Sequence, residues 1–243
     1  MRQFLTIWRR EFTSCFLSPV AYITMIAFLL LSGVTFVSAV ISNVGSDEDP
    51  AALLFSGIVL WMTFLITVVS MRLFAEENRA GTFETLITSP VTETEIVLGK
   101  YAGGISFVWI VIAPTLSYLY ILSAMNPAMR GVDPGHLVGG VLIVALLSAF
   151  CLALGLLVSM LTRNQIIAAI CCFCAVWFVL LFGWLVSALP VEFSVATDSF
   201  DAITHLEEYT RGVLDLRPLV LYLTGTFFVL FTAIRVLAWR HWR

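Results

Sequence analysis

The sequence predicts an all-α integral membrane protein with six transmembrane helices. Hydrophobic residues make up 60% of the chain and charged residues only 12%, and the mean hydropathy of +0.99 exceeds that of soluble domains. Five uncharged runs reach about 20 residues, enough to cross a bilayer core, and a sixth is interrupted only by Arg235, whose long side chain can reach the interface. The expected spans are residues 20–41, 53–71, 101–125, 137–161, 166–189 and 219–239.

The distribution of Lys and Arg predicts the orientation, because cytoplasmic segments retain positive charge. With the N-terminus inside, ten of the thirteen basic residues fall on the cytoplasmic side: Arg2, Arg9, Arg10, Arg72, Arg79, Lys100, Arg163, Arg235, Arg240 and Arg243. Only Arg130, Arg211 and Arg217 fall outside. Both termini are therefore expected in the cytoplasm. The net charge of −3 argues against a nucleic-acid partner.

Residues 1–17, before the first span, have the pattern of an amphipathic helix. Aromatic side chains recur every four residues, at Phe4, Trp8, Phe12 and Phe16. Arg9 and Arg10 occupy other positions around the helix. The pattern favours a helix on the inner leaflet, and a frayed extension of the first span is the alternative.

The cytoplasmic segment 72–100, between the second and third spans, mixes charges with apolar residues. The second span is expected to continue to Arg79 and to stop at Gly81 in the left-handed conformation. A short helix over residues 83–88 would follow, ended by Ser89 and Pro90. Thr92 and Glu95 then have capping-box spacing for the third helix. Such a crossing helix suits docking of a soluble partner, and a solvated connecting loop remains equally open.

The outer segment 190–218 contains apolar residues at helical spacing, namely Phe200, Ile203, Leu206, Tyr209 and Val213. This spacing predicts a short amphipathic helix at the outer membrane surface, with Thr197 or Asp198 as the N-cap and Gly212 as an interruption.

Several other motifs bear on function. The cysteines Cys171, Cys172 and Cys174 have no His, Asp or Glu nearby on their helix, so they are interpreted as small, buried apolar residues. Gly99 and Gly103 could mark close helix packing or a chance match, and Pro114 predicts a kink. The sequence lacks a phosphate-binding P-loop. No ionisable residue lies in the centre of a span, which disfavours an ion-driven pump.

Residues 74–91, with the sequence FAEENRAGTFETLITSPV, and residues 95–100, EIVLGK, strongly resemble permease subunits of type-2 ABC transporters. The gliding-motility-associated permease group is the most similar. Residues 18–22 and 209–217 are also similar to that group, so the resemblance runs nearly end to end.

The resemblance implies that residues 1–243 form one transmembrane permease domain, half of an exporter in the inner membrane of a bacterium. This half would pair with a second copy or a sister permease. Separate ABC ATPase subunits would bind ATP and Mg²⁺, and this chain would bind no cofactor or metal and have no catalytic residue. An auxiliary envelope protein is a further possible partner beside the lipid bilayer.

The resemblance also assigns regions. The coupling helix that contacts the ATPase would involve Glu76, Glu77, Arg79, Gly81, Thr82, Phe83, Glu84, Leu86, Ser89 and Pro90. The N-terminal helix, with Phe4, Trp8, Arg9, Arg10 and Phe12, would correspond to the connecting helix. Outer helices beside the exit would include Tyr209, Arg211, Gly212 and Asp215.

Two alternatives remain at this point. The chain could anchor a motility or envelope complex without moving a substrate. It could also be an intramembrane metalloprotease, because Glu76 and Glu77 precede an arginine as in the paired-glutamate motif of prenyl-protein proteases. The histidines, His136, His205 and His241, lie in outside loops and at the C-terminus, which disfavours an intramembrane metal site.

Overall fold

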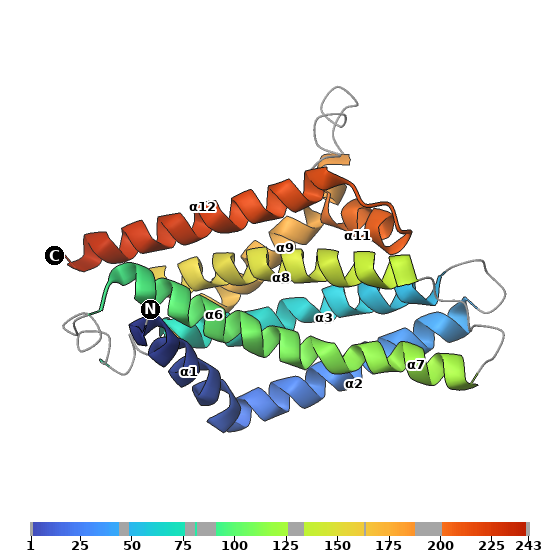
Figure 1. Ribbon diagram of the computed structural model, residues 1–243, viewed down its shortest axis with the longest axis horizontal. Coiled ribbons are helices and arrows are strands. Elements are labelled where there is room, and N and C mark those ends of the chain that lie inside the picture. The colour runs from blue at the N-terminus through green and yellow to red at the C-terminus, as the bar shows by residue number, and fades with distance from the viewer. Residues whose placement is uncertain are drawn as a thin grey trace.

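The computed structural model describes residues 2–43, 49–75, 81, 91–125, 134–162, 164–187 and 201–241. These residues form helices and no strand, and six of the helical stretches are long and apolar enough to cross a membrane. The prediction of an all-α protein with six spans is therefore confirmed. Both termini lie at the same end of the bundle (Figure 1), called the terminal end below; the other end is called the distal end.

The long helices lie side by side, and the short ones cover the two ends (Figure 1). The first half of the chain contains α1 (Arg2–Leu17), α2 (Pro19–Ser42), α3 (Pro50–Leu73), α6 (Glu93–Ile112), η1 (Ala113–Thr115) and α7 (Leu116–Met125). The second half contains α8 (Pro134–Leu161), α9 (Gln165–Ser187), α11 (Ala202–Thr210) and α12 (Leu216–His241).

Capping side chains fix the residues at which α6 and α11 begin. Thr92 and Glu95 form the predicted capping box of α6, each satisfying a backbone N–H of the other. Asp201 caps α11 by accepting a hydrogen bond from the Ile203 amide. The expected caps Thr197 and Asp198 lie outside the described residues, and the helix that carries Tyr209 begins after Asp201 instead.

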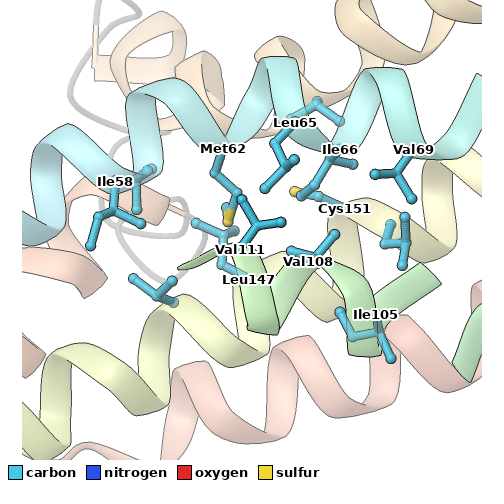
Figure 2. Close-up of a cluster of buried hydrophobic side chains, with 14 of the residues drawn as sticks. Ile58, Met62, Leu65, Ile66, Val69, Ile105, Val108, Val111, Leu147 and Cys151 are labelled. Carbon is cyan, nitrogen blue, oxygen red and sulfur yellow. The ribbon is translucent and has the colours of Figure 1, made fainter. Parts of the chain in front are cut away.

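The core lies where α3 meets α6 and α8. Figure 2 shows Met62 and Ile66 of α3 facing Val108 of α6 and Leu147 of α8. In the most apolar stretch of α3, 61% of the residues are buried inside the protein. The corresponding share is 17% for α2 and for α12. The central helix α3 therefore contacts several neighbours, whereas α2 and α12 present most of their surface to lipid.

The third span changes its helix type at Pro114, the residue at which the sequence predicts a kink. The α-helical conformation gives way to a 3₁₀ turn at Ala113–Thr115, because Pro114 lacks the N–H that an α-helical hydrogen bond requires. Beyond this turn, the Tyr118 hydroxyl donates a hydrogen bond to the Leu29 carbonyl of α2 over 2.9 Å. This bond joins α7 to the first span.

The prediction of buried cysteines is correct for Cys172 and wrong for Cys171 and Cys174. None of the five cysteines forms a disulfide, and Cys172 is buried with its Sγ 3.0 Å from the Ser70 Oγ of α3. Cys171 and Cys174 are exposed, because residues one before and two after Cys172 point to other sides of a helix with 3.6 residues per turn. Their thiols face the surroundings of the bundle.

Candidate functional site

The last turn of α3 is fixed to α8 at the terminal end. The amides of Phe74 and Ala75 donate hydrogen bonds to the Ser159 Oγ over 3.3 and 3.0 Å. α3 ends at Leu73, and the backbone of Phe74 leaves the helical conformation with a φ of −129°. The helix was expected to continue unbroken to Arg79; it is interrupted at Phe74 instead, and residues 76–79 lie outside the described residues.

A buried lysine joins α6 to this point and to α1. Lys100 is 1% exposed, and its Nζ donates a hydrogen bond to the Glu11 Oε1 over 2.9 Å. The same ammonium group lies 5.1 Å from the centre of the Phe74 ring, within range of a cation–π interaction. Lys100, Glu11 and Phe74, called the Lys100 cluster below, connect the start of α6, the middle of α1 and the end of α3.

Two glycines of α6 allow α1 to approach closely. A Cβ at Gly99 would lie 2.8 Å from the Ile7 Cγ2, and one at Gly103 would lie 2.7 Å from the Glu11 Cβ. The Trp8 Nε1 donates a hydrogen bond to the Ser106 Oγ over 3.2 Å. Gly99 and Gly103 are therefore packing residues rather than a chance match.

The predicted helix before the first span is confirmed as α1. Its aromatic face was expected to lie on the inner leaflet, but it contacts α6 instead. Trp8 stacks on Phe12, which contacts Phe16, and the Phe16 ring meets Phe107 of α6 edge to face. Trp8 and Phe12 are half-buried and Arg9 is exposed. The aromatic face thus packs on the protein instead of resting on lipid.

Between these fixed points lies the predicted coupling segment. Gly81 has a φ of +70°, the left-handed conformation predicted for it. The other residues expected to couple to an ATPase lie outside the described residues: Glu76, Glu77, Arg79, Thr82, Phe83, Glu84, Leu86, Ser89 and Pro90. The segment thus begins just after the Ser159 contact and ends at the capping box of α6.

A further contact fixes the junction between α1 and α2. The Arg72 guanidinium, near the end of α3, donates a hydrogen bond to the Ser18 hydroxyl in the break between those helices. The end of α3 is therefore joined to the start of the first span as well as to α1.

At the distal end, three of the four predicted outer residues lie together. The Tyr209 hydroxyl donates a hydrogen bond to the Asp215 carbonyl, and Gly212, with a φ of +78°, ends α11 as predicted. The Tyr209 backbone carbonyl presses on α8, where a Cβ at Gly139 would lie 2.1 Å from its oxygen. Arg211 is exposed and pairs only loosely with Glu207, 3.7 Å away.

The comparisons with known proteins agree with this arrangement. A family described as ABC-2 family transporter protein matches residues 5–231. The chain belongs to this family. No curated protein matches the chain.

As an ABC-2 membrane domain, the chain is a permease subunit of an ABC transporter. The match includes most of α1 and runs through most of α12. Membership implies partner ATPase subunits and accounts for the absence of a P-loop in the sequence. It also favours a permease over the metalloprotease hypothesis, and no group of three or more His, Cys, Asp or Glu within the described ranges could hold a metal ion.

Several contacts of the permease were missed from its sequence. Glu11 is the only acidic residue before the first span, and it lies on the same helical face as Trp8. An acid on an otherwise apolar face is a signal for a buried basic partner, and it could have identified Lys100. The hydrogen bonds that the Ser159 and Ser18 hydroxyls accept have no such signal in the sequence, because isolated serines are common in membrane proteins.

Two histidines also make contacts between helices that the sequence did not predict. His136, in the first turn of α8, pairs with the N-cap residue of α3, Asp49. His205 is 4% exposed within α11, and its Nδ1 lies 3.3 Å from the Tyr222 hydroxyl of α12. Each histidine therefore joins two helices at the distal end.

The buried His205 predicts that the permease loses stability in acid. Burial lowers the pKa of His205, against the opposing effect of the carboxylates of Glu208, Asp201 and Asp215. The folded state therefore keeps the ring neutral at pH values where the unfolded state, with a pKa of about 6.5, takes up a proton. Stability should be full above about pH 6.5 and fall as the pH decreases below it.

The measurement is the melting temperature of the purified permease at pH 7.5 and pH 5.5. The decrease should be smaller in His205→Gln, which carries no titrating ring, than in the unmodified protein. Equal decreases in the two proteins would assign the acid sensitivity to other groups.

Proposed function

We propose that this permease forms half of a translocation path and is driven by ATP hydrolysis through the segment between α3 and α6. ATP and Mg²⁺ bind to separate ATPase subunits, which push on residues 76–90. The movement passes into α3, α6 and α1 and opens a path toward the other side of the membrane.

The observation that carries this proposal is the attachment of both flanks of the segment to the bundle. On one side, the amides of Phe74 and Ala75 are bound to Ser159. On the other side, the Thr92 capping box begins α6, and Lys100 two turns later is paired with Glu11. A segment held in this way transmits displacement to three helices, whereas a loosely attached loop would absorb it.

The remaining features of the proposal rest on the charge distribution and on the resemblance. The excess of Lys and Arg at the terminal end supports placing that end in the cytoplasm. The similarity of residues 74–91 to gliding-motility-associated permeases supports a dimeric exporter in a bacterial inner membrane, made with a second copy or a sister permease. The apolar faces of α2 and α12 are available for such pairing.

Substitutions in the coupling segment test the proposal. In the complex with its ATPase, Phe83→Ala and Glu84→Ala should each lower permease-stimulated ATP hydrolysis by about tenfold, the loss that removal of one interface anchor of about 1.4 kcal/mol produces. Matched controls are Tyr120→Ala, an exposed aromatic of α7, and Glu207→Ala, an exposed acid of α11. Unchanged ATPase binding and stimulation in both segment variants would refute the coupling assignment.

A second experiment separates transport from anchoring. Vesicles that contain the complete complex should move cargo when ATP is supplied, and Phe83→Ala should abolish that movement. A complex that assembles and hydrolyses ATP but moves no cargo would favour a role as an anchor of a motility or envelope assembly.

A further inference from the structure

The outward face of α1 carries two adjacent arginines around a shallow hollow. The hollow has a volume of about 460 Å³ and is lined by Leu5, Thr6, Arg9, Arg10 and Thr13. Arg9 and Arg10 are both exposed, and neither pairs with a carboxylate in the part of the chain that the structure describes. The Thr13 hydroxyl donates to their backbone carbonyls over 2.8 and 3.0 Å.

This face points away from the protein because the opposite face of α1 is already occupied. Trp8 and Glu11 contact α6 through Ser106 and Lys100. An amphipathic helix that turns its aromatic side to the bundle must present its basic side to the surroundings. Two guanidinium forks on neighbouring residues match the oxygens of a phosphate group, which they can bind in a bidentate manner.

The contacts of α1 place it at the depth of lipid headgroups. Glu11 meets Lys100, the residue at which the uncharged stretch of α6 begins, and Ser18 meets Arg72, the residue at which the uncharged stretch of α3 ends. Charge gives way to apolar sequence at the boundary between headgroups and hydrocarbon. Arg9 and Arg10 precede Glu11 directly and therefore lie at or just outside that boundary.

We propose that the outward face of α1 binds the phosphate of an anionic phospholipid. Arg9 and Arg10 contact the phosphate, while Leu5 at the edge of the hollow and Leu17, 83% exposed at the end of the helix, contact acyl chains. The apolar residues favour a lipid over free inorganic phosphate. This site is independent of the coupling proposed above, because it uses the opposite face of α1.

The test measures lipid binding to the full-length permease in detergent by native mass spectrometry, with dioleoylphosphatidylglycerol as the probe. Arg9→Gln and Arg10→Gln should each weaken binding about fivefold, and the double variant about 25-fold, since one arginine near an anionic surface contributes about a factor of five. The matched control Arg211→Gln/Arg217→Gln removes the same charge at the distal end, where both side chains are exposed, and should bind like the unmodified protein.

Two further arms identify the ligand. Dioleoylphosphatidylcholine, whose headgroup has no net charge, should bind equally weakly to all variants, and millimolar sodium phosphate should not displace the anionic lipid. Arg9→Lys/Arg10→Lys keeps the charge but loses the bidentate guanidinium geometry, so it should bind the anionic lipid more tightly than Arg9→Gln/Arg10→Gln and less tightly than the unmodified protein. Binding by this variant excludes misfolding as the cause of the loss.

Three results would overturn the proposal. Equal phosphatidylglycerol binding by the Arg9→Gln/Arg10→Gln variant and the distal control would show that no such lipid site exists. Displacement by sodium phosphate would identify a free anion as the ligand. If the Arg9→Gln/Arg10→Gln variant still bound the lipid but no longer bound the ATPase subunit, this face of α1 would be shown to contact a protein.

Discussion

Replacing Glu11 with alanine should destabilise the permease by about 3 kcal/mol, the lower range for breaking a buried ion pair. The Lys100 ammonium group is 1% exposed, and its bond to Glu11 is 2.9 Å long. Loss of this carboxylate leaves a positive charge inside the protein with one fewer anionic partner, and the cation–π contact with Phe74 cannot replace it. Unfolding in a denaturing detergent, followed by circular dichroism, measures the change.

A double variant without either charge separates the effect of the ion pair from that of packing. The Glu11→Leu/Lys100→Met variant removes both charges at similar volume and should be markedly more stable than Glu11→Ala, because no charge stays buried. The control Glu207→Ala removes an exposed acid that lies 3.7 Å from Arg211, and it should change the stability by less than about 1 kcal/mol. Equal losses in Glu11→Ala and Glu207→Ala would contradict a structural role for the Lys100 cluster.

Gly103→Val should separate α1 from α6 and cost about 1–3 kcal/mol of stability. Even a single Cβ at this position would lie 2.7 Å from the Glu11 Cβ and 3.3 Å from the Phe12 backbone nitrogen. Backbone cannot move aside as a flexible side chain can, so α1 itself must shift. That shift should also lower stimulated ATP hydrolysis, because Glu11 would lose its contact with Lys100.

Gly33→Ala in α2 is the matched control. A Cβ there would lie 3.5 Å from the Tyr118 hydroxyl oxygen, which is ordinary contact. Melting temperature and stimulated ATPase activity should both stay near the values of the unmodified protein. A Gly103→Val permease that matches Gly33→Ala in both measurements would show that close packing of α1 is unimportant.

The features that the sequence predicted correctly are those set by local chemistry. Span number follows from the lengths of apolar runs, the start of α6 from the capping-box spacing of Thr92 and Glu95, and the end of α11 from Gly212. The 3₁₀ turn at Pro114 follows from a missing amide hydrogen. Each of these signals lies within a few residues of its effect.

The features that were missed depend on contacts between distant residues. The end of α3 is set by Ser159, more than eighty residues later in the chain, and no pattern near Leu73 indicates that partner. The same limit applies to α1, whose aromatic face could rest on lipid or on protein with the same periodicity. Contacts with the distant helix α6, such as those of Gly103 with Glu11 and of Phe107 with Phe16, decide between them.

The most direct test of the proposed energy transfer is a photo-cross-link from the segment between α3 and α6. Phe83 is replaced with the photo-reactive benzoylphenylalanine in the complex of permease and ATPase, and Phe227 of α12, which is 73% exposed, is replaced in the same way as a control. The account predicts a covalent adduct with the ATPase subunit from position 83 and none from position 227. An active complex in which position 83 forms no adduct with the ATPase would contradict it.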